Sequence, residues 1–186
     1  MGTAQGGQDG TEPQGYREWL FKLLGDRDPL EVMARTAAAL EGIVRGHPTT
    51  LLHTRPAEGK WSPTEVIGHL VDGEWVYGYR VRFILCEDSP VIMGMDQNLW
   101  VTGMRHNDQD PAGLLEQFRS LREFNLSVWK RMSPADLQRA GRHSERGTES
   151  LGVLLKLFGG HDLAHLDQIA RTIQAIQETG KGLEKN

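Results

Sequence analysis

The sequence contains almost no cysteine and no long hydrophobic run. Cys86 is the only cysteine among 186 residues, so no disulfide can form within the chain and a reducing compartment is expected. No stretch approaches the roughly 18 consecutive apolar residues of a membrane-spanning helix. The first residues also lack the basic start and apolar core of a signal peptide. The sequence therefore predicts a cytoplasmic protein without membrane spans.

An excess of positive charge is also missing. The chain has 21 Lys and Arg against 25 Asp and Glu, a net charge of -4 and a pI near 6.0. This balance argues against nucleic acid or an anionic membrane as a partner. The length suits one domain with a sizeable core. We expect that domain over residues 16–180, after a Gly- and Gln-rich lead over 1–15 whose composition predicts disorder.

Convincing strand alternation is absent, whereas signals for helix starts recur along the chain. Three of them, "DPLE" at 28–31, "SPTE" at 62–65 and "DP" at 110–111, place an N-capping side chain directly before a proline. Apolar residues then follow at helical spacing. The predicted helices cover 16–24, 28–46, 62–86, 110–129 and 150–177. The four long amphipathic ones predict an all-α four-helix bundle.

The connection over residues 87–109 constrains the topology. It contains Pro90 and two glycines, so it extends neither neighbouring helix. A 25-residue helix is about 37 Å long, and a connector of 23 residues reaches about 75 Å when extended. Antiparallel neighbours would need only a short loop. We therefore expect a long crossover between two parallel helices, an up-down-down-up bundle, and a connector that walls a pocket.

Two histidines lie four residues apart on the apolar stripe of the last helix. His161 and His165 point about 40° apart, so two imidazoles one turn apart can bind one metal ion. His69 is the only other histidine inside a long predicted helix, because the remaining ones fall in expected loops (His47, His53, His106 and His143). Three nitrogen donors with open positions for water are typical of a catalytic metal centre. Such an ion lowers the pKa of a bound water or thiol and polarises a carbonyl.

A polar core without metal is the alternative interpretation. With seven histidines, a HxxxH pair arises by chance in roughly one such sequence in four. Buried imidazoles must then find hydrogen-bond partners, because an unpaired buried polar group costs about 1–3 kcal/mol. Gln168 and Thr172 lie on the same stripe, so its polarity is sustained. Both interpretations predict a polar layer inside the bundle.

Three segments in order resemble the DinB/YfiT superfamily of metal-dependent enzymes. They are "KWSPTEVIGHLVDGE" (60–74), "MDQNLWV" (95–101) and "GGHDLAHLDQI" (159–169), and the similarity extends over about residues 28–178. The resemblance implies a four-helix bundle with the crossover described above. It also implies that His69, His161 and His165 bind a divalent cation, often zinc or nickel, and that the protein forms a homodimer.

The same resemblance implies an activity. Characterised relatives include S-transferases that use bacillithiol or mycothiol, and a mycothiol-dependent maleylpyruvate isomerase. We therefore expect transfer of a low-molecular-weight thiol to a small electrophilic substrate, with the cation stabilising the thiolate. The alternatives are a metal-dependent hydrolase, or a non-catalytic metal-binding dimer in a stress response.

Four residues near the histidines are further candidates. Glu65 and Asp72 lie one turn before and one turn after His69, where a carboxylate could act as a general acid or base, although most acids at such positions are solvated. Trp100, on the long connector, and Gln168 are candidates for the wall of a pocket.

Other residues are expected to be structural. Asp162 points away from His161 and is predicted at the surface, as are Arg80, Arg105 and Arg122. Three tryptophans are expected in the core, namely Trp61, Trp75 and Trp129. Cys86 is interpreted as a small apolar filler.

Overall fold

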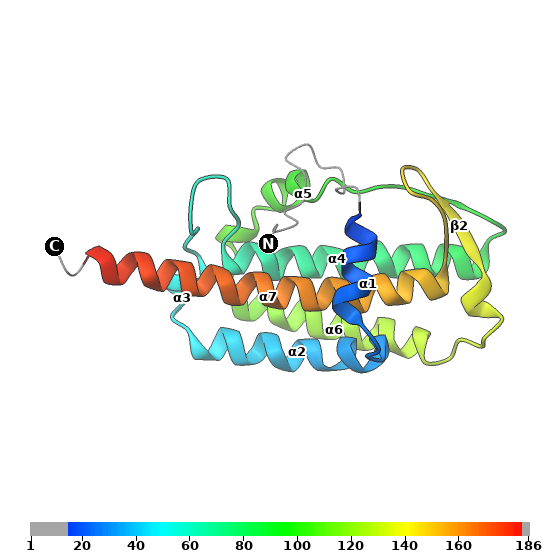
Figure 1. The fold of residues 1–186 in the computed structure, drawn as a ribbon, viewed down its shortest axis with the longest axis horizontal. Coiled ribbons are helices and arrows are strands. Elements are labelled where there is room, and N and C mark those ends of the chain that lie inside the picture. Colours follow the sequence, from blue (N-terminus) through cyan, green and yellow to red (C-terminus); the bar gives the residue numbers. More distant parts are fainter. Residues whose placement is uncertain (1–14, 184–186) are drawn as a thin grey trace.

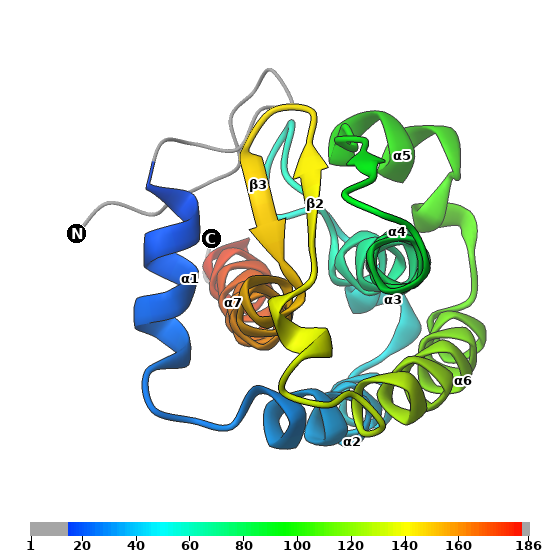
Figure 2. The same cartoon turned by 90° about the vertical axis from the view of Figure 1, so that its right-hand side faces the viewer.

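Four long helices form a bundle in the computed structural model, which describes residues 15–183. They are α2 (Pro29–Gly46), α4 (Pro63–Cys86), α6 (Pro111–Trp129) and α7 (Leu151–Leu183) (Figure 1). The short helix α1 (Tyr16–Leu24) packs outside α7 (Figure 2). The predicted bundle is confirmed. The lead over 1–15 lies, apart from Gly15, outside the described residues, and the domain bounds stay a prediction.

The direction of the helices confirms the predicted crossover. In Figure 1, α4 and α6 run one way and α2 and α7 run the other, which is the up-down-down-up order. After α4 the chain returns along the same side of the bundle before α6 begins. This return holds α5 (Gln97–Gly103) and the 3-10 helix η1 (His106–Asp108), both in contact with α4, while the short α3 (Thr49–Leu52) follows α2.

Local side-chain bonds explain where the long helices begin. The carboxylate of Asp28 accepts from the backbone N–H of Leu30 at 2.9 Å, and Asp110 caps α6 in the same way. At the start of α4, the hydroxyl of Ser62 accepts from the N–H of Glu65, whose carboxylate accepts from the N–H of Ser62. Each cap satisfies N–H groups that a helix leaves without partners, so these sequence signals are physically sound.

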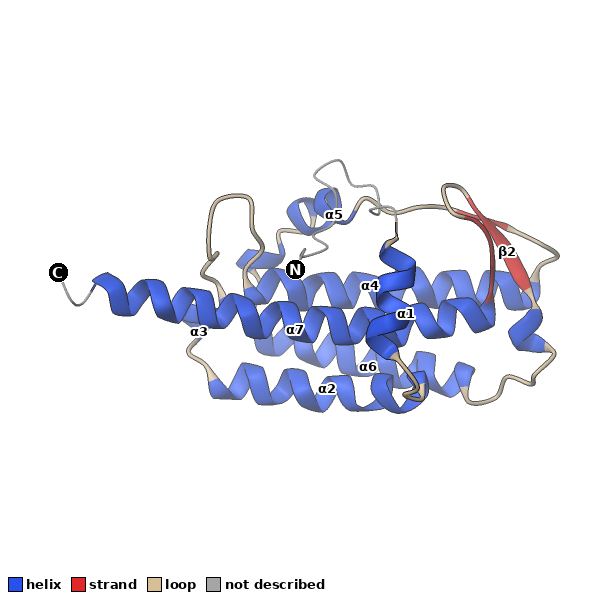
Figure 3. Ribbon diagram, in the orientation of Figure 1, coloured by secondary structure: helices blue, strands red, loops and turns tan. Residues whose placement is uncertain are grey.

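A small sheet corrects the expectation of no strands. It consists of β1 (Val91–Ile92), β2 (Ala140–His143) and β3 (Gly147–Ser150), as Figure 3 shows, with the 3-10 helix η2 (Asp136–Gln138) before β2. Strands β2 and β3 pair antiparallel, and β1 of the crossover pairs parallel with β2. Strands of two to four residues are too short for an alternating pattern to be recognised.

The sheet packs closely on the end of α4. A Cβ atom at Gly141 would lie 2.9 Å from the side chain of Ile84 and 3.1 Å from the carbonyl oxygen of Pro90. Only glycine therefore fits where β2 crosses the helix. This contact fixes the crossover against the bundle at the end where β1 begins.

Helix α7 extends to Leu183, beyond the predicted end near residue 177. The residues from Gln177 to Gly180 are exposed, so the buried stripe ends where the prediction placed the helix end. Among residues 15–183, no helix is long and apolar enough to cross a membrane.

A polar layer separates two apolar clusters of the core. The first cluster takes residues from the C-terminal part of α4 and the N-terminal part of α7, such as Tyr77, Ile84 and Leu154. The second takes residues from the opposite parts of the same two helices, such as Ile67 and Ile169. The buried polar side chains between them come from all four long helices (Thr36, His69, Asp72, Glu74, Arg122, Asn125, His161, Asp162 and His165).

Candidate metal centre

Three histidines from two helices converge in the polar layer. His69 comes from α4, and His161 and His165 come from successive turns of α7. The Nε2 atom of His161 lies 3.1 Å from Nε2 of His69 and 3.1 Å from Nε2 of His165. The ligand atoms of the group all lie within 4.8 Å of one another, and all three side chains are buried. The structure therefore brings together the three histidines that the sequence singled out.

In two of the three pairs, the spacing of these nitrogens fits a single metal ion. Two nitrogens bound to one ion at about 2.0–2.1 Å lie about 3.3 Å apart in tetrahedral geometry and about 2.9 Å apart at a right angle. The observed separation of 3.1 Å falls between these values. The site thus suits several divalent cations.

Gln168 orients one of the three rings. Its Oε1 atom lies 2.7 Å from Nδ1 of His165, and a carbonyl oxygen can only accept, so the Nδ1–H of His165 donates to it. The Nε2 atom of His165 then carries the lone pair and faces the other histidines. A metal-binding histidine is commonly held in this way through its second nitrogen. Gln168 was expected in the pocket wall, and the structure places it directly behind His165.

Packing holds the ring of His69. Its Nδ1 atom is buried without a hydrogen-bond partner among the described residues. The ring of Trp61 lies 5.1 Å from the ring of His69, centroid to centroid. Trp61 is therefore a half-buried neighbour of the site, close to its expected place in the core.

Burial keeps the three imidazoles neutral. Desolvation lowers the pKa of His69 and His161 well below the usual value, and the neighbouring His165 lowers both further. Desolvation also lowers the pKa of His165 to about 4, against the hydrogen bond to Gln168, which raises it. Metal binding requires the neutral imidazole, so these rings are ready to act as ligands at neutral pH.

The two candidate carboxylates each have another partner. Glu65 accepts from the guanidinium of Arg55 at 2.9 Å and caps α4 through Ser62. Asp72 accepts from Nε2 of His106 at 2.7 Å, and both of these side chains are almost fully buried. Their expected part in acid–base catalysis stays a prediction. Both bonds have a clear structural effect, since they fix the start of α4 and the crossover.

His106, which the sequence predicts in a loop, is buried in the structure. It lies in η1 and is 2% exposed. Its ring occupies the space beside Gly68, where a Cβ atom would lie 2.2 Å from Cγ of His106. The glycine one residue before His69 was the only sequence signal for this close approach. Trp100 lies on α5 of the same crossover and is 41% exposed, so its role in a pocket stays a prediction.

Several residues expected at the surface are buried, and the reverse also occurs. Arg122, Asp162 and Arg80 are 2%, 0% and 4% exposed, whereas Arg105 is exposed as predicted. The signal for the first two was present, because each follows a phenylalanine of the apolar stripe by four residues (Phe118 and Phe158). Trp75 and Cys86 are exposed rather than part of the core, while Trp129 is buried as expected.

The topology and the three inward-facing histidines place the protein among helical bundles with a buried, histidine-rich centre. The sequence profile described as the DinB superfamily matches residues 33–169. The chain therefore belongs to the DinB superfamily, and the resemblance noted in the sequence is confirmed.

Curated relatives are similar over most of their length. A protein of Oceanobacillus iheyensis named "Putative metal-dependent hydrolase OB0782" is 28% identical over 123 residues, 64% of this chain and 71% of the relative. The Bacillus subtilis protein named "Putative metal-dependent hydrolase YfiT" is 22% identical over 148 residues, 76% and 82% of the two chains. These names describe the relatives.

A solved structure shows the same fold. The structure titled "YfiT from Bacillus subtilis is a probable metal-dependent hydrolase with an unusual four-helix bundle topology" matches with a TM-score of 0.69 at 22% sequence identity. The match covers 77% of this chain and 84% of YfiT. At this identity the likeness establishes the fold and the order of its helices.

Proposed function

We propose that the protein is a metal-dependent hydrolase of a small molecule, with one divalent cation held by His69, His161 and His165. The observation that carries this proposal is the convergence of three buried, neutral imidazoles, with Nε2 atoms 3.1 Å apart in two of the pairs. Hydrolysis is favoured because the two curated relatives described above carry that name. Zinc and nickel are the expected cations, since both accept imidazole ligands.

The residues around the histidines prepare the site. When bound, the cation supplies Lewis acidity, which lowers the pKa of a coordinated water and polarises a carbonyl. Gln168 fixes the orientation of His165, and Trp61 packs against His69. The ring of Tyr77 lies edge-on to the ring of His161, with 6.0 Å between their centroids. Three protein ligands leave coordination positions for water and substrate.

Transfer of a low-molecular-weight thiol to a small electrophile is the second candidate. It is favoured because Glu65 and Asp72 already accept hydrogen bonds, from Arg55 and His106 respectively. A hydrolase needs a proton acceptor near the attacking water. A co-substrate thiol brings its own nucleophile once it is deprotonated.

Metal content is the first test of the proposal. The parent protein and a His161→Ala/His165→Ala variant are saturated with zinc or nickel, desalted and measured by elemental analysis. We expect close to one metal per chain in the parent and a loss in the variant. His47→Ala is the matched control, because His47 lies at the end of α2 and bonds to the carbonyl of Ile43. A parent that binds no metal overturns both candidate reactions and favours a non-catalytic bundle.

Activity then separates the two candidates. The metal-loaded protein is assayed on esters and amides, and on epoxides and alkyl halides, each with and without bacillithiol or mycothiol. Turnover that needs no thiol supports hydrolysis, whereas a thioether product formed only with thiol supports S-transfer.

A homodimer is part of the same proposal. The exposed aromatic side chains of Trp75, Tyr79 and Phe124 give α4 and α6 an apolar surface for it. Light scattering of the parent and of Trp75→Ser tests this assembly, and a monomeric parent contradicts it.

A further inference from the structure

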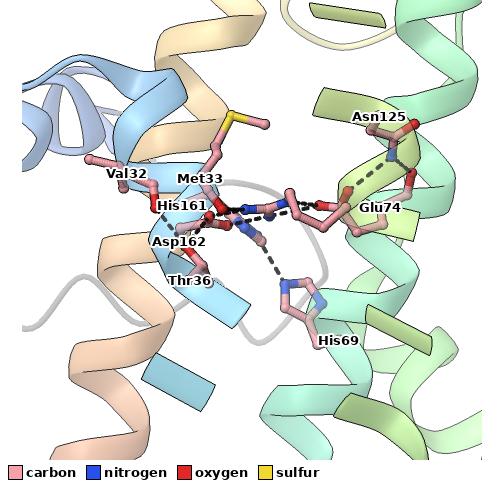
Figure 4. A network of polar contacts seen from close by, with 9 residues as sticks. Val32, Met33, Thr36, His69, Glu74, Asn125, His161 and Asp162 are labelled. Atoms are coloured by element: carbon pink, nitrogen blue, oxygen red, sulfur yellow. Dashed lines mark hydrogen bonds and ion pairs between the residues drawn. The ribbon is translucent and has the colours of Figure 1, made fainter. Parts of the chain in front are cut away.

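A buried ionic network lies beside the three histidines and takes no part in the ligand set proposed above. Arg122 of α6 pairs with Glu74 of α4 and Asp162 of α7 (Figure 4). These three side chains are between 1% and 3% exposed. Burying charges costs solvation energy, and the attraction between the paired charges returns only part of it. Well-packed apolar side chains in the same positions would therefore stabilise the bundle equally well. The network therefore calls for an explanation other than stability.

Arg122 uses every N–H group that it has. Its Nε and Nη2 atoms donate to Oε1 of Glu74 at 2.9 and 2.7 Å. Nη2 and Nη1 donate to the two carboxylate oxygens of Asp162, and Nη1 also donates to the carbonyl oxygen of Met33 at 2.8 Å. A guanidinium has five N–H donors, and all five have acceptors here. Nothing in this arrangement is left to bind a ligand.

Both carboxylates pair with Arg122, which favours their ionised form. Both oxygens of Asp162 accept from Arg122, and the hydroxyl of Thr36 lies 2.6 Å from one of them. Burial raises the pKa of Glu74, whereas Arg122 and the amide of Asn125, which donates to Glu74 at 2.9 Å, lower it. One guanidinium and two carboxylates give the network a formal net charge of -1.

Arg82 lies next to the network without joining it. It meets the network through Asn125, whose Oδ1 atom accepts from Nη1 of Arg82 at 2.9 Å, and its guanidinium stacks on the ring of Phe124. Arg82 forms no ion pair with Glu74 or Asp162 among the described residues, so the three paired side chains keep their own formal charge of -1.

The network and the histidines share one layer of the bundle. Asp162 follows His161 directly in α7, and Glu74 comes five residues after His69, about 7.5 Å further along α4. Figure 4 shows the His69–His161 pair beside the carboxylates. Three neutral imidazoles contribute no negative charge to balance a divalent cation, and charges interact strongly in a buried layer.

We propose that the Glu74–Arg122–Asp162 network supplies the buried negative charge that stabilises a divalent cation at the three histidines. The inference rests on the proposed function, because it concerns the affinity of that same site. It assigns to Glu74 and Asp162 a role in metal binding without contact with the metal, while Arg122 holds the two carboxylates in place.

Three substitutions separate the effect of charge from the effect of shape. Glu74→Gln removes one negative charge and keeps the size of the side chain. Arg122→Lys keeps the charge and loses donors, so it disturbs the geometry of the network. Thr36→Val, which removes one hydrogen bond to Asp162 without a change of charge, serves as a second shape control.

The experiment measures the Kd for zinc of each full-length variant by competition with a chromogenic chelator. Melting temperatures are recorded in parallel. We expect Glu74→Gln to raise Kd about tenfold or more. We expect Arg122→Lys and Thr36→Val to lower the melting temperature and to leave Kd within about threefold of the parent value. If Arg122→Lys does not fold, Thr36→Val supplies the shape control.

The absorption spectrum of the cobalt-loaded protein provides a second readout. Glu74→Gln keeps all three ligands, so its cobalt bands are expected at the parent wavelengths. Two outcomes overturn this inference alone, provided that the parent binds zinc. One is a displacement of the cobalt bands of Glu74→Gln, and the other is a Kd of Glu74→Gln equal to that of the parent. A parent that binds no zinc overturns the proposed function itself.

Discussion

Replacement of Gly68 by alanine tests how the crossover is held against α4. A Cβ atom at this position would lie 2.2, 2.6 and 2.7 Å from Cγ, Nδ1 and Cβ of His106. Separations under 3 Å cannot persist, so the ring of His106 must move. Its bond to Asp72, at 2.7 Å between two buried side chains, is then lost or distorted.

The expected magnitude combines three effects. Overpacking of a filled site costs about 1–3 kcal/mol, and loss of a buried hydrogen bond to a charged group costs about 1.5–3 kcal/mol. Alanine is favoured over glycine in a helix by about 1 kcal/mol, which offsets part of this. We expect a net loss of about 2–5 kcal/mol, or roughly 4–20 °C in melting temperature for a domain of this size.

Chemical and thermal unfolding of Gly68→Ala and Gly42→Ala provide the assay. Gly42 lies inside α2, and a Cβ atom there has no neighbour within 4 Å, so this control reports helix propensity alone. The control is expected to be as stable as the parent or more stable by up to about 1 kcal/mol. A Gly68→Ala variant with the same stability as Gly42→Ala would refute the close packing of His106 on α4.

Two further predictions concern the histidines. Gln168→Ala is expected to weaken zinc binding about 10- to 100-fold, because His165 loses the acceptor for its Nδ1–H. The control is Gln174→Ala, since Gln174 is exposed. Equal Kd values for the two variants would contradict the role of Gln168. The metal-free protein is expected to lose stability as the pH falls from about 6.5 towards 4. Burial lowers the folded-state pKa of His165 and His143 to about 4. Burial also lowers the pKa of His69 and His161 well below the usual value, so the unfolded chain binds protons that the native state does not. Urea unfolding at pH 7 and pH 5 measures the effect, about 1.4 kcal/mol per pH unit for each such proton; a curve that is flat in this range would show that the histidines are not buried in the neutral form.

Much of the architecture follows from local signals. The capping side chains at residues 28, 62 and 110 fix the starts of three helices, because each satisfies backbone N–H groups within its own first turn. The length of the connector over 87–109 required a crossover, since a tight turn uses far fewer residues. The spacing of His161 and His165 placed two imidazoles on one face of a helix. These inferences needed only distances along the chain.

The tertiary structure decided everything that depends on contacts between distant segments. The sheet forms because the crossover meets the hairpin before α7, and strands of two to four residues carry no periodic signal of their own. The burial of His106 depends on the absence of a side chain at Gly68, on a different element. Arg122 and Asp162 were expected in water because a lone charge is costly to bury. Only the packed bundle brings Arg122 together with Glu74 and Asp162, and their mutual bonds make that burial possible.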